Sequence, residues 1–121
     1  MSFVFVTLGG AFGAVVRYAI SLIPVKGQFP ILTLLTNILG AILIGFIVGL
    51  TQKEGDVSAN TVLFWKTGVC GGFTTFSTFS LEAFQLFERR AYAKGGAYVT
   101  LSVCCCIFGI LIGKKLATAI A

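Results

Sequence analysis

Histidine is absent from this 121-residue sequence, and only four residues are acidic. With no histidine, no paired carboxylates and no thiol beside a base, the chain lacks the usual groups for acid–base or nucleophilic catalysis. Charged residues make up 11% of the chain, whereas hydrophobic residues make up 57%. One small soluble core could not bury so much apolar surface. The composition therefore argues against an enzyme and against a small soluble domain, and it indicates a protein of the lipid bilayer.

Cysteine is present four times, as Cys70 and as the run Cys104, Cys105, Cys106. Adjacent residues of a helix point about 100° apart, so the run cannot converge on one ion. Without histidine, a tetrahedral metal site also lacks partners. We interpret the cysteines as small apolar side chains within helices. Palmitoylation is the weaker alternative, because the run lies deep in its segment.

Four apolar segments are separated by short polar stretches. They cover roughly residues 3–23, 30–50, 61–87 and 97–119. Each is long enough to cross ~30 Å of hydrocarbon at ~1.5 Å per residue. The sequence predicts an all-α integral membrane protein, with one four-helix membrane domain over residues 1–121.

Lysine and arginine are almost evenly divided between the two sides of such a domain. The loops after the first and third segments share one side (side A), and the loop after the second segment shares side B with the end of the fourth. Side A has Lys26, Arg89, Arg90, Lys94 and nearby Arg17, against Lys53, Lys114, Lys115 and nearby Lys66 on side B.

A chain of fixed topology normally has a clear Lys/Arg excess on its cytoplasmic side. The near balance either reflects the small number of charges in a short chain or indicates insertion in both orientations with antiparallel pairing. Charge alone leaves both explanations open. The net charge of +5 is shared by both surfaces, where it can contact anionic lipid, and it requires no nucleic acid.

Every apolar segment contains a Gly-x-x-x-Gly pair. Such pairs let helix backbones approach closely in a membrane, so they predict a tight bundle or a dimer. The pairs are Gly9/Gly13, Gly45/Gly49, Gly68/Gly72 and Gly109/Gly113.

Polar residues inside the segments are costly in hydrocarbon and so indicate an ion or substrate pathway. Counting residues from side A places Ser102 about 8 Å deep, Asn37 about 10 Å, Phe79 about 12 Å and Phe76 about 16 Å. Arg17 and Glu82 lie nearer the surface. We expect Asn37 to face the third segment, whereas for Thr33 we favour a hydrogen bond within its own helix.

The stretch GVCGGFTTFSTFSLE (residues 68–82) combines two features. Gly71 and Gly72 weaken the helix and the following threonines can stabilise a break, whose freed carbonyls are potential Na⁺ ligands. Phe73, Phe76 and Phe79 recur every third residue, a spacing that by itself usually indicates packing. The hydroxyl residues between them favour a small anion instead, since ring edges and hydroxyl donors both suit one.

Three stretches together carry a family resemblance: GGAFGAVVRY (9–18), TLLTNILGAILIG (33–45) and GVCGGFTTFSTFSLE (68–82). They resemble the signature regions of the Fluc (CrcB-type) fluoride channels, whose length and four-segment plan also match. The resemblance implies a dual-topology antiparallel homodimer in the bacterial plasma (inner) membrane. It further implies two pores, a structural Na⁺ at the dimer centre and passive export of F⁻, and the broken third helix predicted from the residues agrees with such a central cation.

The resemblance also implies roles for particular residues. Phe76, Phe79 and Asn37 match the pore residues, and Arg17 matches the vestibule arginine. Na⁺ would be held by the backbone carbonyls of Gly71 and Thr74. The fourth-helix polar positions match Tyr98 and Ser102, and the third-helix polar track matches Ser77, Thr78 and Glu82. Cys106 stands where relatives often carry another hydroxyl, which alters the inner end of the polar track.

A small multidrug-resistance-type exporter of cationic compounds is the alternative function, because it shares the size, helix count and dual topology. A resemblance to these exporters would require a glutamate within the membrane-spanning part of the first helix. Here the charge in that helix is Arg17 and no acid is present. A purely structural four-helix subunit would explain the glycines but not the convergent polar layer.

Overall fold

The computed structural model describes residues 1–55 and 57–120, and all regular structure in these ranges is helical. The predicted all-α class is confirmed. The elements are α1 (Ser2–Ser21), α2 (Ile31–Glu54), α3 (Ala59–Val62), the π-helix η1 (Leu63–Cys70), α4 (Gly71–Phe73), α5 (Phe76–Glu88) and α6 (Tyr92–Ile120).

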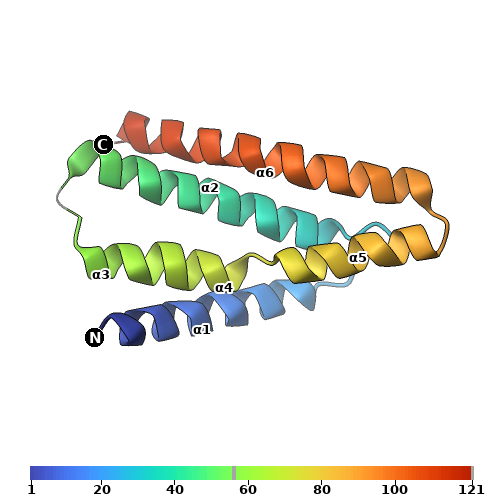
Figure 1. Cartoon of the computed structure of the whole chain (residues 1–121), viewed down its shortest axis with the longest axis horizontal. Helices are drawn as coiled ribbons and strands as arrows, with labels where there is room; N and C mark the ends of the chain where they lie inside the picture. Colours follow the sequence, from blue (N-terminus) through green and yellow to red (C-terminus); the bar gives the residue numbers. More distant parts are fainter. Residues whose placement is uncertain (56, 121) are drawn as a thin grey trace.

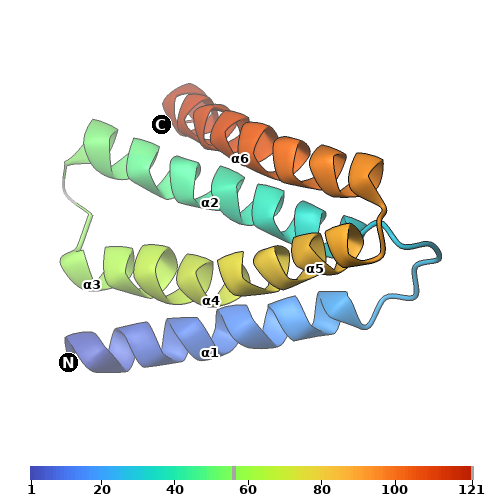
Figure 2. The same ribbon diagram turned by 45° about the vertical axis from the view of Figure 1, so that its right-hand side comes forward.

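The helices form two pairs that lie side by side, and the two helices of each pair run in the same direction, opposite to that of the other pair (Figure 1). In Figures 1 and 2, α6 runs along α2, and α1 runs along α3, η1 and α4. The third segment then continues as α5, which contacts α6 at the other end of the bundle. The start of α1 and the end of α6 lie at the same end of the molecule (Figure 1).

Glycine accounts for the close approach within each pair. A Cβ atom at Gly13 of α1 would collide with the carbonyl oxygen of Val69 and lie 2.8 Å from the Phe73 nitrogen. On α6, a Cβ atom at Gly113 would collide with the Ile42 carbonyl oxygen of α2. The Gly-x-x-x-Gly pairs therefore join helices within one chain, α1 to the third segment and α2 to α6.

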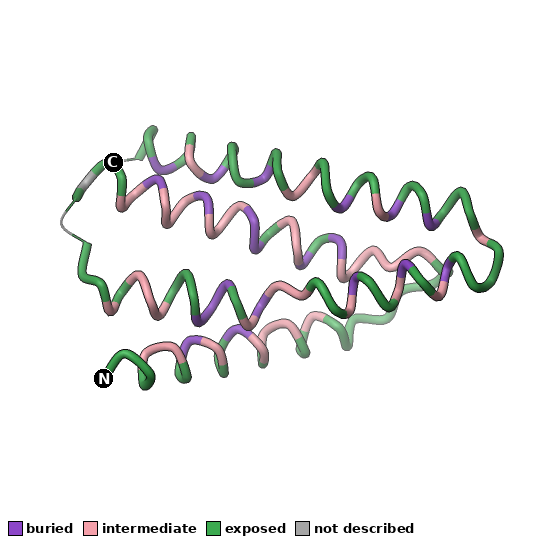
Figure 3. The backbone as a smooth tube through the Cα atoms, viewed as in Figure 1, coloured by how far each residue is buried: buried purple, intermediate pink, exposed green. Residues whose placement is uncertain are grey.

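The outer surface of the bundle is apolar. Residues such as Phe3, Phe12, Ile107 and Phe108 are more than half exposed, and Figure 3 shows burial confined to the inward faces of the helices. Three helices, α1, α2 and α6, are long and apolar enough to cross a membrane, with mean hydropathies of 1.7, 2.5 and 2.1. Since lipid can cover such a surface, the exposure is consistent with a membrane protein.

The third segment is not one continuous α-helix. Thr74 and Thr75 are extended, with φ/ψ of −87°/157° and −150°/118°, and they separate α4 from α5. Gly71 and Gly72 remain helical. Thr75 begins α5 as its N-cap, because its Oγ1 accepts a hydrogen bond from the Thr78 N–H at 3.1 Å. The break thus starts with the threonines rather than with the glycines.

Candidate functional site

Asn37 of α2 holds the break in the third segment. In a continuous helix, the Thr75 N–H would donate to the Gly71 carbonyl. Here it donates to Asn37 Oδ1 at 2.8 Å, and Asn37 Nδ2 donates to the Thr75 carbonyl at 3.1 Å. The amide side chain therefore takes the place of the helical acceptor of the Thr75 N–H and adds a donor to the Thr75 carbonyl at the N-cap of α5. One of the two Nδ2 hydrogens is used in this pairing, which leaves the other for a ligand.

Arg17 of α1 satisfies another carbonyl that the break frees. Its Nε donates to the Gly72 carbonyl at 3.1 Å, in place of the Phe76 N–H that would reach this carbonyl in a continuous helix. Within residues 1–55 and 57–120, no hydrogen bond reaches the carbonyls of Gly71 or Thr74. Two backbone oxygens close to the break are thus left without donors.

A groove of about 560 Å³ lies beside the break, between α2, the third segment and α6. Asn37, Phe76, Phe79 and Ser102 all line it. Counting residues along the segments predicted that these four reach one layer, and they do share this groove. Gly71, Thr74 and Cys106 line it as well, and Cys106 lies one helical turn beyond Ser102.

Ser102 carries a buried polar atom with no partner. The residue is 6% exposed, and its Oγ has no hydrogen bond within the described part of the chain. A buried hydroxyl without a partner is unfavourable by ~1–3 kcal/mol, so such groups usually meet water or a ligand. The Ser102 hydroxyl is therefore available as a donor to whatever enters the groove.

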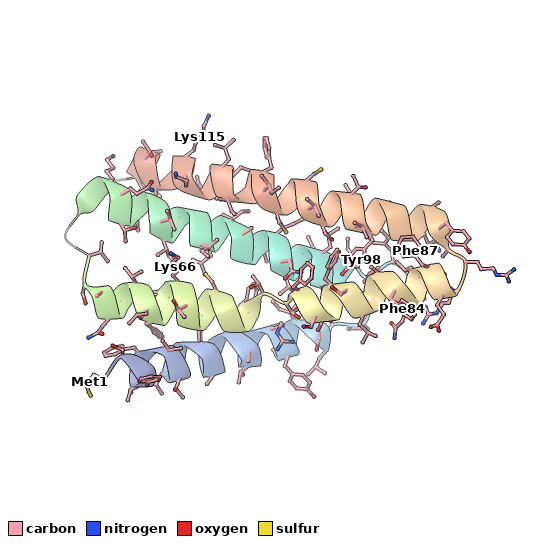
Figure 4. The ribbon with its side chains drawn as sticks, viewed as in Figure 1. Met1, Lys66, Phe84, Phe87, Tyr98 and Lys115 are labelled. Carbon is pink, nitrogen blue, oxygen red and sulfur yellow. The ribbon has the colours of Figure 1, made fainter. Side chains whose placement is uncertain are left out.

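The two phenylalanines of the groove and the buried Tyr98 form a row of neighbouring aromatic rings. The ring centroid of Phe79 lies 5.5 Å from that of Phe76 and 5.1 Å from that of Tyr98. Phe76 is 78% exposed in the single chain, whereas Phe79 is 9% exposed and Tyr98 is fully buried. Figure 4 shows Tyr98 between α6 and α5.

Glu82 of α5 accepts two hydroxyl hydrogen bonds from two other helices. Tyr98 donates to Oε1 at 3.0 Å, and Thr33 donates to Oε2 at 3.1 Å. The prediction that Thr33 bonds within its own helix is wrong, because a carboxylate on the neighbouring helix is a stronger acceptor than a backbone carbonyl. Counting residues from side A could have paired Thr33 with Glu82, since the count places both residues near that side.

The remaining predicted site residues lie outside the groove. Ser77 is exposed, and Thr78 is half-buried with its N–H on the Thr75 side chain. Arg17 and Glu82 do not line the groove either, since one bonds to the break from α1 and the other lies beyond Tyr98. The structure thus brings six predicted residues to the groove, namely Asn37, Gly71, Thr74, Phe76, Phe79 and Ser102.

We expect Tyr98→Phe to lower the free energy of unfolding by ~1–3 kcal/mol, because it removes one of the two hydroxyl donors on a carboxylate. Thr33→Val should have an effect of the same sign. The measurement is thermal unfolding in detergent, with Thr7→Val as control, since Thr7 is exposed and bonds only to Phe3 of its own helix. Equal unfolding temperatures for Tyr98→Phe and the parent would show that the Glu82 bonds contribute nothing.

Comparison with known proteins decides the family. Residues 4–114 match the family described as CrcB-like protein, Camphor Resistance (CrcB). The chain belongs to the CrcB family. Together with the apolar helices, CrcB membership makes it a multi-pass integral membrane protein.

Curated relatives in the CrcB family resemble this chain over most of its length. A Clostridium perfringens protein is 44% identical over 115 residues, which is 93% of this chain and 90% of the relative. A Methanococcus maripaludis protein is 44% identical over 108 residues, covering 88% of each chain, and a Pyrococcus furiosus protein is 42% identical over 113 residues, covering 93% and 92%. All three are named fluoride-specific ion channel FluC, the name of a channel rather than an enzyme.

Proposed function

We propose that the protein is a fluoride-selective channel that exports F⁻ passively and lowers cytoplasmic fluoride, and that it acts in the bacterial plasma (inner) membrane. The observation that carries this proposal is the groove, which gathers Asn37, Ser102, Phe76 and Phe79 from three elements. The names of the curated relatives support the choice of fluoride as the permeant ion.

Fluoride is small and holds its water strongly, so a pore must replace that shell with close donors. The groove can offer the second Nδ2 hydrogen of Asn37 and the unpartnered hydroxyl of Ser102. Phe76 and Phe79 add the positive edges of their rings. None of these four groups carries a full charge, so the ion can be bound without being trapped.

Liposomes reconstituted with the protein and loaded with F⁻ and Cl⁻ test this function. We expect F⁻ to leave and Cl⁻ to stay. The alternative, export of cationic compounds, predicts instead that a proton gradient drives uptake of a cationic dye. Dye uptake without F⁻ release would overturn the proposed channel.

We further propose that the working unit is an antiparallel homodimer in which each chain crosses the membrane four times, the third crossing being the broken segment 59–88. The groove-side surface of a single chain supports this, because Phe76 is 78% exposed and Gly71 is also exposed beside it. A second copy laid across the break would cover both residues. The near balance of Lys and Arg between the two sides supports insertion in both orientations.

Dual insertion predicts that a reporter fused to the C-terminus is found on both sides of the membrane in comparable amounts. Because Lys and Arg set orientation, adding three lysines to the 24–29 loop should bias insertion. Fluoride efflux should then fall, because antiparallel partners become scarce. A reporter found on one side only would argue against the antiparallel dimer.

A structural Na⁺ at the dimer centre is the cofactor that we propose. The carbonyls of Gly71 and Thr74 fit this ion, because hard cations prefer oxygen ligands and these two oxygens have no donors in the described chain. Two carbonyls from each copy would supply four ligands. When bound, the ion would fix the two breaks against each other.

Replacing Na⁺ by a large organic cation should therefore lower both dimer stability and F⁻ efflux. Thr74→Ser should behave as the parent, since only the backbone oxygen is used, whereas Gly71→Leu should weaken the response to Na⁺. The measurements are dimer dissociation in detergent and efflux at varied Na⁺. Indifference of both to Na⁺ would show that the break holds no ion.

A further inference from the structure

Among the described residues that line the groove, Lys66 is the one that carries a charge, and none is acidic. Lys66 lies on the π-helix η1 and is exposed. Figure 4 shows its side chain between the third segment and α2. An ionisable side chain inside an apolar segment is costly, so its position calls for a reason. Thr67, the next residue, lines the groove as well.

Arg17 lies outside the groove lining, so its charge reaches the groove only as a field from the α1 side. The Nε of Arg17 bonds to the Gly72 carbonyl from the α1 side, and Arg17 is absent from the groove lining. Among the described residues, the positive charge within the groove lining itself is that of Lys66.

Lys66 lies well away along the third segment from the uncharged donors of the groove. Lys66 precedes Phe76 by ten residues, which would be ~15 Å along the axis of a continuous α-helix. Because of this separation along the segment, we assign Lys66 no direct part in replacing the water of an ion held between Asn37 and Ser102. Lys66 can raise the anion concentration in the groove, because its field acts over roughly a Debye length, ~8 Å at 0.15 M salt and ~30 Å at 0.01 M.

We propose that Lys66 is an anion-concentrating residue of the groove, which increases fluoride entry without taking part in the uncharged filter. This inference rests on the proposed fluoride channel. It assigns to η1 a part in conduction that is distinct from the filter residues on α2, α5 and α6.

The test compares Lys66→Gln, Lys66→Glu and Lys66→Arg by initial F⁻ efflux at fixed low Na⁺, with ionic strength set by an inert salt of large ions. At low ionic strength we expect a loss of about threefold for Lys66→Gln and about tenfold for Lys66→Glu, with Lys66→Arg near the parent. Near 1 M salt the Debye length is ~3 Å, and the variants should converge on the parent. Lys115→Glu is the control, since Figure 4 shows Lys115 pointing away from the bundle and the change in net charge is the same.

Two results would overturn this inference while leaving the channel in place. One is efflux by Lys66→Gln and Lys66→Glu equal to that of the parent at low ionic strength. The other is a loss that high salt does not relieve, which would indicate a packing role for Lys66. A parent chain that releases no F⁻ at all would overturn the proposed function and this inference with it.

Discussion

Phe79→Ile and Asn37→Asp are each expected to abolish F⁻ efflux while the protein remains folded. Phe79 lines the groove and lies against both Phe76 and Tyr98, so an aliphatic side chain removes the ring edge that would face an ion in the proposed pore. Asn37→Asp replaces the amide donor by a negative charge. That charge repels both the anion and the Thr75 carbonyl to which Asn37 donates.

The size of the loss follows from the donors removed. A hydrogen bond to a charged group is worth ~1.5–3 kcal/mol, and each 1.4 kcal/mol is tenfold, so losing one donor lowers efflux by ~10- to 100-fold. The added repulsion should take Asn37→Asp below detection. Phe76→Ile should be impaired but active, because Asn37, Phe79 and Ser102 still line the groove.

Matched controls separate a pore effect from a folding effect. Phe84→Ile makes the same change on α5 at a residue that is 61% exposed and outside the groove. Asn60→Asp makes the other change on α3. Both should conduct as the parent does. Parental efflux by Phe79→Ile and Asn37→Asp would mean that the phenylalanines only pack and that the ion passes elsewhere.

Gly113→Ala is expected to lower the free energy of unfolding more than any other variant named above. The new Cβ would collide with the Ile42 carbonyl oxygen and lie 2.7 Å from the Phe46 nitrogen, and backbone atoms of α2 cannot move aside as a flexible side chain can. Overpacking of this kind costs about 1–3 kcal/mol or more. The measurement is the unfolding temperature in detergent.

Gly96→Ala is the control for this substitution. Gly96 lies on the same helix, α6, with no atom within 4 Å of an added Cβ. Because alanine favours the helix by ~0.8–1 kcal/mol over glycine, this variant should be as stable as the parent or more so. If Gly113→Ala also unfolded at the parental temperature, the close contact of α2 with α6 would not be what holds the chain together.

Much of the fold follows from patterns that act along the chain. Apolar segment length predicts helices, and the Gly-Gly-x-Thr-Thr stretch predicts an interruption, because these are local properties of the backbone. The glycine pairs predict close packing as well. They do not say which helix meets which, since Gly13 and Gly113 carry the same signal, so the pairing within one chain emerged only from the structure.

The parts that could not be predicted depend on contacts between distant residues. Nothing in LFWKTGVC marks a π-helix, and Asn37 could have faced lipid, another helix or a ligand. Its bonds to Thr75 depend on how α2 lies against the break. Arg17 is a similar case, because a charge near the surface predicts an exposed role, whereas its Nε bonds to the Gly72 carbonyl.

The most direct test of the central claim is parallel recording of F⁻ and Cl⁻ release from one population of liposomes. Ion-selective electrodes would follow both ions after a K⁺ ionophore allows charge to balance. The uncharged donors Asn37 and Ser102 of the groove predict rapid F⁻ release with Cl⁻ fully retained, and no F⁻ release from liposomes that carry Phe79→Ile. Equal release of both ions, or retention of both by the parent protein, would contradict a fluoride channel built on this groove.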